Sequence, residues 1–150
     1  MDSTKAEIFY DRAIAKGRLN NYQEAILDYT KSIQLKEDLD AYYNRALMKV
    51  ELKDYDNAIL DFDKSYEIKK DNPKFYFLRG DCKFLIKDYN ASILDLTKSI
   101  ELKPDYAQAY FFRGLAEMNL KEKESACADL NKAKTLNYNK ADDFIQKYCN

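Results

Sequence analysis

Polar and apolar residues recur along the chain with the period of an α-helix. Between residues 73 and 106, a first helical face carries Tyr76, Arg79, Gly80 and Lys83. A second face follows at about the same interval with Ser92, Leu96, Ser99 and Leu102. The polar pair Lys87-Asp88 lies between the two faces, so we expect a hairpin of two helices, each of roughly 14 residues.

Four copies of this pattern fill most of the chain. The second half of the hairpin recurs at offsets of 33, 34 and 34 residues, as NNYQEAILDYTKSIQLK (20–36), KDYDNAILDFDKSYEIK (53–69), KDYNASILDLTKSIELK (87–103) and a more divergent KEKESACADLNKAKTLN (121–137). A period of this length indicates a stacked repeat architecture, in which each unit buries its apolar face only against its neighbours.

These copies resemble the tetratricopeptide repeat (TPR). Counted from Ala6, Leu39, Pro73 and Ala107, the family's aromatic fourth position holds Phe9, Tyr42, Tyr76 and Tyr110. Its small eighth position holds Ala13, Ala46, Gly80 and Gly114, and its small twentieth holds Ala25, Ala58, Ser92 and Ala126. The resemblance implies an all-α fold, a right-handed α-solenoid of four helix hairpins.

The resemblance also sets the expected boundaries. We expect one domain over residues 1–150, with repeats at 6–38, 39–72, 73–106 and 107–140. Residues 141–150 are expected to form a short capping helix, because one helical face would carry Ala141, Phe144, Ile145 and Tyr148. The chain's ending also resembles that of small stand-alone bacterial TPR proteins. Lys123 replaces the aromatic found at this position in the other repeats, which predicts looser packing of the fourth.

Two charged positions are the same in all four repeats. The seventh position holds Arg12, Arg45, Arg79 and Arg113, and the twenty-third holds Asp28, Asp61, Asp95 and Asp129. In an antiparallel hairpin that turns near the fifteenth residue, these two positions lie at the same height. A guanidinium can form a bidentate pair with a carboxylate there. We therefore predict a structural Arg–Asp ladder, with an anion-binding row of arginines as the alternative.

Composition disfavours several classes of function. The 26 acidic residues nearly balance the 25 basic ones, and the net charge of -1 gives no uniform field for nucleic acid or an anionic membrane. The chain has no His, which removes the commonest general base and metal ligand. No Gly-rich phosphate loop and no activated nucleophile occurs. We expect no metal, no cofactor and no catalytic residues, and the protein is not expected to be an enzyme.

The three cysteines indicate a reducing environment. Cys82, Cys127 and Cys149 are odd in number and form no C-x-x-C pair, so we expect reduced thiols rather than a disulfide or a zinc site. The first residues mix charges and lack an apolar stretch, and no run is long enough to span a bilayer. The sequence therefore predicts a soluble cytoplasmic protein, unless a leader has been removed.

In the TPR family, the first helices of successive hairpins line a concave face. The family uses chiefly the second, fifth, ninth and twelfth positions there. The second is polar, and the fifth and ninth hold Tyr10, Tyr43, Phe77, Phe111, Ile14, Leu47, Asp81 and Leu115. The resemblance implies that these side chains form an unusually apolar groove, although the aromatic ones can also stack between neighbouring helices. An open apolar strip would be a binding surface.

One TPR subfamily grips the C-terminal carboxylate of cytosolic chaperones through five polar side chains. The corresponding positions here hold Tyr10, Ile14, Asn44, Lys74 and Leu78. Only Asn44 and Lys74 match, and the paired cations that would anchor a carboxylate are missing. The sequence disfavours chaperone tails as partners, and Asn44 and Lys74 are retained as candidate contacts within the groove.

The sequence therefore predicts a noncatalytic adaptor or scaffold that binds a peptide or partner helix in its groove. Self-association through the terminal repeats is the alternative within the same class. Neither prediction identifies the partner, because TPR proteins share their architecture across unrelated processes.

Overall fold

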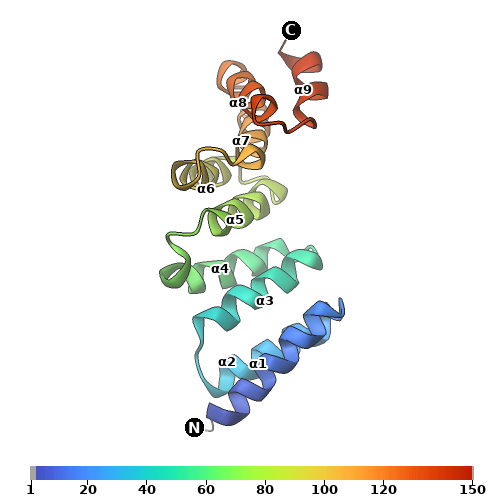
Figure 1. Ribbon diagram of the computed structural model, residues 1–150, viewed down its shortest axis with the longest axis vertical. Helices are drawn as coiled ribbons and strands as arrows, with labels where there is room; N and C mark the ends of the chain where they lie inside the picture. The colour runs from blue at the N-terminus through green and yellow to red at the C-terminus, as the bar shows by residue number, and fades with distance from the viewer. Residues whose placement is uncertain (1–2, 150) are drawn as a thin grey trace. The chain divides into compact units, whose positions relative to one another are not determined.

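The computed structural model describes residues 3–149, which form nine helices and no strand (Figure 1). The helices are α1 (Ser3–Arg18), α2 (Tyr22–Leu35), α3 (Leu39–Glu51), α4 (Tyr55–Lys69), α5 (Pro73–Leu85), α6 (Tyr89–Leu102), α7 (Ala107–Asn119), α8 (Lys123–Thr135) and α9 (Ala141–Tyr148). The predicted all-α class is confirmed. Residues 1, 2 and 150, which the predicted domain and cap include, lie outside the described part of the chain. None of the described helices is long and apolar enough to cross a membrane.

The helices pair into four hairpins followed by a capping helix, as the sequence predicts. The first eight helices pack in consecutive pairs, α1/α2, α3/α4, α5/α6 and α7/α8. The chain divides into two compact units, one ending at Lys70 and the other starting at Asp71. In the first unit α2 packs against α3, and in the second α6 packs against α7 and α8 against α9.

Small side chains let the paired helices approach closely. In the first unit, Ala13 and Ala25 are fully buried beside Tyr29. In the second unit, a Cβ added at Gly114 would lie 3.0 Å from the backbone oxygen of Ala126, so a larger residue would push α7 away from α8. The small eighth and twentieth positions of each repeat thus set the spacing within each hairpin.

Every hairpin turns through a residue in the left-handed region. These residues, with φ between 61° and 67°, are Asn20, Lys53, Lys87 and Lys121. The N–H of the following residue donates to the carbonyl five positions earlier at 2.9–3.0 Å, which closes the end of the first helix. The chain reverses within three residues, and this short connection fixes the antiparallel register.

A bidentate ion pair joins the two helices of each hairpin, as predicted. In all four pairs the guanidinium Nε and Nη2 atoms donate to the two carboxylate oxygens at 2.6–2.9 Å. The carboxylates are buried. The pairs are Arg12–Asp28, Arg45–Asp61, Arg79–Asp95 and Arg113–Asp129. Since a buried carboxylate is costly without charged donors, each hairpin is stable only in the register that brings these residues together.

Further contacts hold each arginine in place. Each guanidinium lies 5.1–5.8 Å from the ring at the fourth repeat position. In the first unit, Arg45 Nη1 donates to Thr30 Oγ1 of the preceding hairpin at 2.9 Å. In the second unit, Arg113 Nη1 donates to Thr97 Oγ1 at 3.0 Å. The same guanidinium therefore joins the helices of its own hairpin and links that hairpin to the one before it.

Replacing Arg45 by Lys should lower the free energy of unfolding by about 1–3 kcal/mol, because Lys lacks the planar fork that serves both oxygens of buried Asp61. Arg12→Lys is the matched control at the same repeat position. The Arg12 side chain is 53% exposed against 14% for Arg45, so its loss should be clearly smaller. Urea denaturation followed by circular dichroism measures both. Equal losses of unfolding free energy in the two variants would show that the contribution of the ion pair does not depend on how deeply the arginine is buried.

Candidate functional site

In the first unit, the structure brings together several of the predicted groove residues. Tyr10, Ile14, Tyr43, Asn44 and Leu47 are all half-buried, on α1 and α3. Asn44 Nδ2 donates to the Tyr10 hydroxyl at 2.9 Å, which links the first helices of the two hairpins. Burial, with the nearby Asp40 carboxylate, raises the pKa of Tyr10, so this hydroxyl is neutral at physiological pH. These residues present both polar and apolar groups on neighbouring helices.

A small surface pocket lies beside Tyr10. It has a volume of about 210 Å³ and is lined by Ala6, Glu7, Tyr10, Ser32, Lys36 and Asp38. These residues come from α1, from α2 and from the connection between α2 and α3. The pocket is mixed in charge, with one basic and two acidic side chains, and is large enough to accept a side chain of a bound peptide.

Tyr43 contacts both a buried core residue and a charged side chain. Its ring centroid lies 5.9 Å from that of Phe62, a fully buried core residue of α4. The Lys69 ammonium lies 4.8 Å from the Tyr43 ring centroid and 2.8 Å from Asp40 Oδ1. The aromatic ring at the fifth position therefore packs within its own hairpin and is half-buried.

In the second unit, the two aromatic groove candidates lie in the core. Phe77 is 9% exposed and contacts Tyr106 and Phe112, at centroid distances of 5.0 and 5.8 Å. Phe111 is 5% exposed and is covered by Tyr138 and Phe144, at 5.0 and 5.4 Å. Their main contribution is to packing. Among the other candidates on this unit, Leu115 is half-buried against the same core and Lys74 is exposed on the first turn of α5.

Asp81 is the exceptional polar group among the candidates. Its Oδ1 atom is buried and has no hydrogen-bond partner. Desolvation raises its pKa from 3.8 to about 6, so it is largely ionised at neutral pH despite its surroundings. A buried carboxylate oxygen without a donor is unfavourable, and a ligand that supplied an N–H group or a cation would relieve this.

Sequence reasoning missed Glu117, which occupies the eleventh position of the fourth repeat. In the other three repeats this position holds Lys16, Lys49 and Lys83, whose ammonium groups lie 2.7–2.9 Å from the ladder carboxylates. Glu117 is only 8% exposed, and its Oε2 atom has no partner. Burial is the main cause that raises its pKa from 4.5 to about 7, and the Asp129 charge is the second. Comparing the eleventh residue across the four repeats would have revealed this exchange.

The repeat pattern matches a known family along nearly the whole sequence. A model of the tetratricopeptide repeat matches residues 6–39, 39–72, 73–106 and 107–147. The chain belongs to the tetratricopeptide-repeat family. No curated protein matches it closely enough to show a relative.

Solved structures of other TPR proteins share the fold. A structure of MamA superimposes with a TM-score of 0.85 and 21% identity, covering 91% of this chain and 76% of that one. The structure of YrrB, described as having an unusual peptide-binding site, superimposes with a TM-score of 0.84 and 20% identity, covering 90% of this chain and 70% of that one. The first TPR of Spaghetti (RPAP3), bound to the HSP90 peptide SRMEEVD, superimposes with a TM-score of 0.71 and 24% identity, covering 81% of this chain and 97% of that one. At these identities the likeness shows the TPR fold alone.

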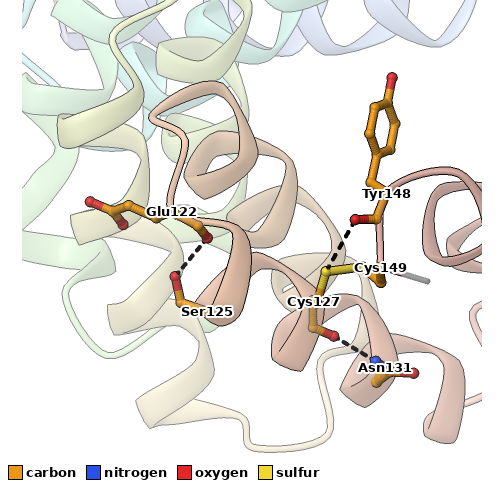
Figure 2. Close-up of a disulfide and its surroundings, with 6 residues drawn as sticks. All are labelled: Glu122, Ser125, Cys127, Asn131, Tyr148 and Cys149. Atoms are coloured by element: carbon orange, nitrogen blue, oxygen red, sulfur yellow. Dashed lines mark hydrogen bonds between the residues drawn. A yellow bond between two sulfur atoms is a disulfide. The ribbon is translucent and has the colours of Figure 1, made fainter.

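The prediction of three reduced thiols is wrong for two of the cysteines. Cys127 and Cys149 form a disulfide, whereas Cys82 is free and buried (Figure 2). The bridge forms because α9 folds back against α8. Cys127 lies eight residues before the end of α8 and Cys149 eight residues after the start of α9, so an antiparallel pairing brings them to the same height. Sequence spacing alone did not reveal this, because it depends on how α9 packs. The expectation of a cytoplasmic location rested partly on reduced thiols and loses that support.

Glu117 should make the stability of this TPR chain depend on pH. The pKa of Glu117 is higher in the folded chain than the usual 4.5, so the folded chain binds this proton more tightly than the unfolded chain does. The free energy of unfolding therefore falls as the pH rises from about 4.5 to about 7. Glu117→Gln should therefore raise the free energy of unfolding by about 1–2 kcal/mol at pH 8 and leave it unchanged at pH 4.

Urea titrations between pH 4 and pH 9 measure this difference. Glu124→Gln, at an exposed position on α8, is the matched control and should follow the original chain at every pH. A Glu117→Gln curve parallel to that of the original chain would show that Glu117 has the same pKa in the folded and the unfolded chain, and would contradict this prediction.

Proposed function

We propose that this TPR protein is a noncatalytic interaction module that binds an extended peptide or a partner helix along the first helices of its hairpins. The observation that carries the proposal is the buried, unpaired Asp81 carboxylate oxygen on α5. It occupies the ninth repeat position, one of those through which the family contacts ligands. Asp81 as a whole is half-buried, and a peptide whose backbone N–H or cationic side chain reached its carboxylate would satisfy this oxygen.

In the second unit, the helix next to α5 carries an apolar residue at the corresponding position. α5 packs against α7, where Leu115 holds the same repeat position as Asp81. A ligand that follows the first helices would contact a carboxylate on one helix and an aliphatic side chain on the next. Phe77 and Phe111, being buried, would support this surface from below.

In the first unit, the ligand surface would be formed by Tyr10, Ile14, Asn44 and Leu47, with the half-buried Tyr43 beside them. The Asn44–Tyr10 hydrogen bond holds these two polar groups in fixed positions on neighbouring helices, which lowers the entropy lost on binding. The adjoining pocket of about 210 Å³ would take one side chain of the ligand.

The peptide-bound RPAP3 structure and the peptide-binding site attributed to YrrB support a peptide as the ligand class. A chaperone-type C-terminal carboxylate is a poor match for this chain, because Tyr10, Ile14 and Leu78 replace polar or cationic clamp residues. Catalysis is not proposed. The chain has no His, and burial raises the pKa of the free Cys82 thiol to about 12, so this thiol is not a nucleophile at neutral pH.

Binding can be tested with peptides selected from a phage-displayed library on the full chain. Asp81→Asn keeps the shape of the side chain but removes its charge, and should weaken the selected peptides about tenfold or more, a loss typical of an anchoring contact. Stability should not fall, because the substitution removes a desolvated carboxylate. Isothermal titration calorimetry and urea denaturation measure the two quantities.

Leu94→Ala is the matched control for this experiment. Leu94 is 73% exposed on α6, a second helix, and its truncation should leave the affinity unchanged. If Leu94→Ala weakens binding and Asp81→Asn does not, the ligand is recognised by the second helices and the proposal fails.

Self-association is the second candidate function. Ile8 on α1, the first helix of the first unit, and Leu19, which follows the end of α1, are exposed and could meet another copy of the chain. Light scattering at two protein concentrations distinguishes the two candidates, because a mass that rises with concentration supports self-association and a constant monomer mass contradicts it.

A further inference from the structure

We propose that the Cys127–Cys149 disulfide is a reversible redox site that locks α9 over the apolar face of α7 and α8. The bridge joins the first half of α8 to the residue that follows α9 (Figure 2). Both cysteines are partly accessible, unlike the buried Cys82. A dithiol protein or a small thiol can therefore reach this sulfur pair, while Cys82 cannot exchange with it.

The face beneath α9 is apolar and belongs to the core of the second unit. Phe111 from α7 and Leu130 and Ala133 from α8 are buried there, packed against Phe144 and Ile145 of α9. Release of α9 would expose these side chains to water. The position of this one helix therefore decides whether the apolar end of the second unit is covered or open.

Apart from the disulfide, α9 is held by the packing of Ala141, Phe144 and Ile145 on this core and by one ion pair at the surface. The helix has eight residues, too few to be stable in isolation. Its ion pair, Lys134 to Asp142 at 2.6 Å, joins two substantially exposed side chains, and such pairs add little. The bridge closes a loop between cysteines 22 positions apart. A crosslink over that length favours the closed form on the order of 100-fold, by loop-closure entropy.

The exchange reaction balances with a dithiol reductant. A thiolate of the reductant attacks the Cys149 sulfur, which lies beyond the end of α9, and the S–S bond breaks with Cys127 leaving as a thiolate that takes up a proton. The second thiol of the reductant then releases Cys149 as a thiol, and the reductant becomes a disulfide. Glutathione disulfide, by accepting the two electrons, can restore the bridge.

Hydrogen exchange of the full chain, followed by mass spectrometry, tests the lock. After reduction with dithiothreitol, amide protection in α9 should fall about tenfold to 100-fold, while α5 and α6 keep theirs. Reoxidation with glutathione disulfide should restore it. The double variant Cys127→Ser, Cys149→Ser should match the reduced chain without any reductant, and should not respond to dithiothreitol.

Three results would overturn the proposal. Equal protection of α9 in the oxidised and reduced chains would show that the bridge does not control the helix. Loss of protection throughout α5–α8 on reduction would make the bridge a global structural crosslink instead of a local lock. Peptide mapping that finds Cys127 and Cys149 as free thiols in glutathione disulfide would show that the pair does not form the bridge reversibly.

Discussion

The buried carboxylate at the twenty-third repeat position is the constraint on which the rest of each hairpin depends. Asp61, for example, receives two hydrogen bonds from Arg45 and lies 2.7 Å from the Lys49 ammonium, with all three groups mostly shielded from water. Such a carboxylate is tolerated only with its partners in place, so the pair favours a single register over any slipped alternative. The first helices then take defined positions, and the surface they present follows from the ladder.

The fourth repeat shows what happens when one member of this set is exchanged. Glu117 stands where the other repeats have Lys, so Asp129 is paired with Arg113 without the lysine of the other hairpins, and a second buried carboxyl group lies beside it. The last hairpin therefore relies on other contacts, chiefly the cover that α9 places over Phe111 and Leu130 and the disulfide that holds α9 there. The earlier hairpins have a Lys beside each ladder carboxylate, whereas the last hairpin has apolar packing by α9 and a disulfide bond.

The sequence alone predicted the features that depend on period. The helix hairpins, their turns and the Arg–Asp pairing all follow from residues that recur at fixed repeat positions. The features that depend on what covers a surface were not predictable in this way. Phe77 and Phe111 share a repeat position with the half-buried Tyr10 and Tyr43, but their exposure is decided by neighbours such as Tyr106 and Phe144. The disulfide likewise requires the packing direction of α9, and the unpaired Asp81 oxygen requires knowledge of every group around it.

A double-mutant cycle on Arg45 and Asp61 tests the central claim that the ladder fixes the hairpins. The free energy of unfolding is measured for the original chain, for Arg45→Ala, for Asp61→Ala and for the double variant. If the pair acts as a unit, each single variant loses much of what the double variant loses, and the coupling energy is at least about 1.5 kcal/mol. A coupling energy near zero, with the two losses simply additive, would contradict a structural ladder.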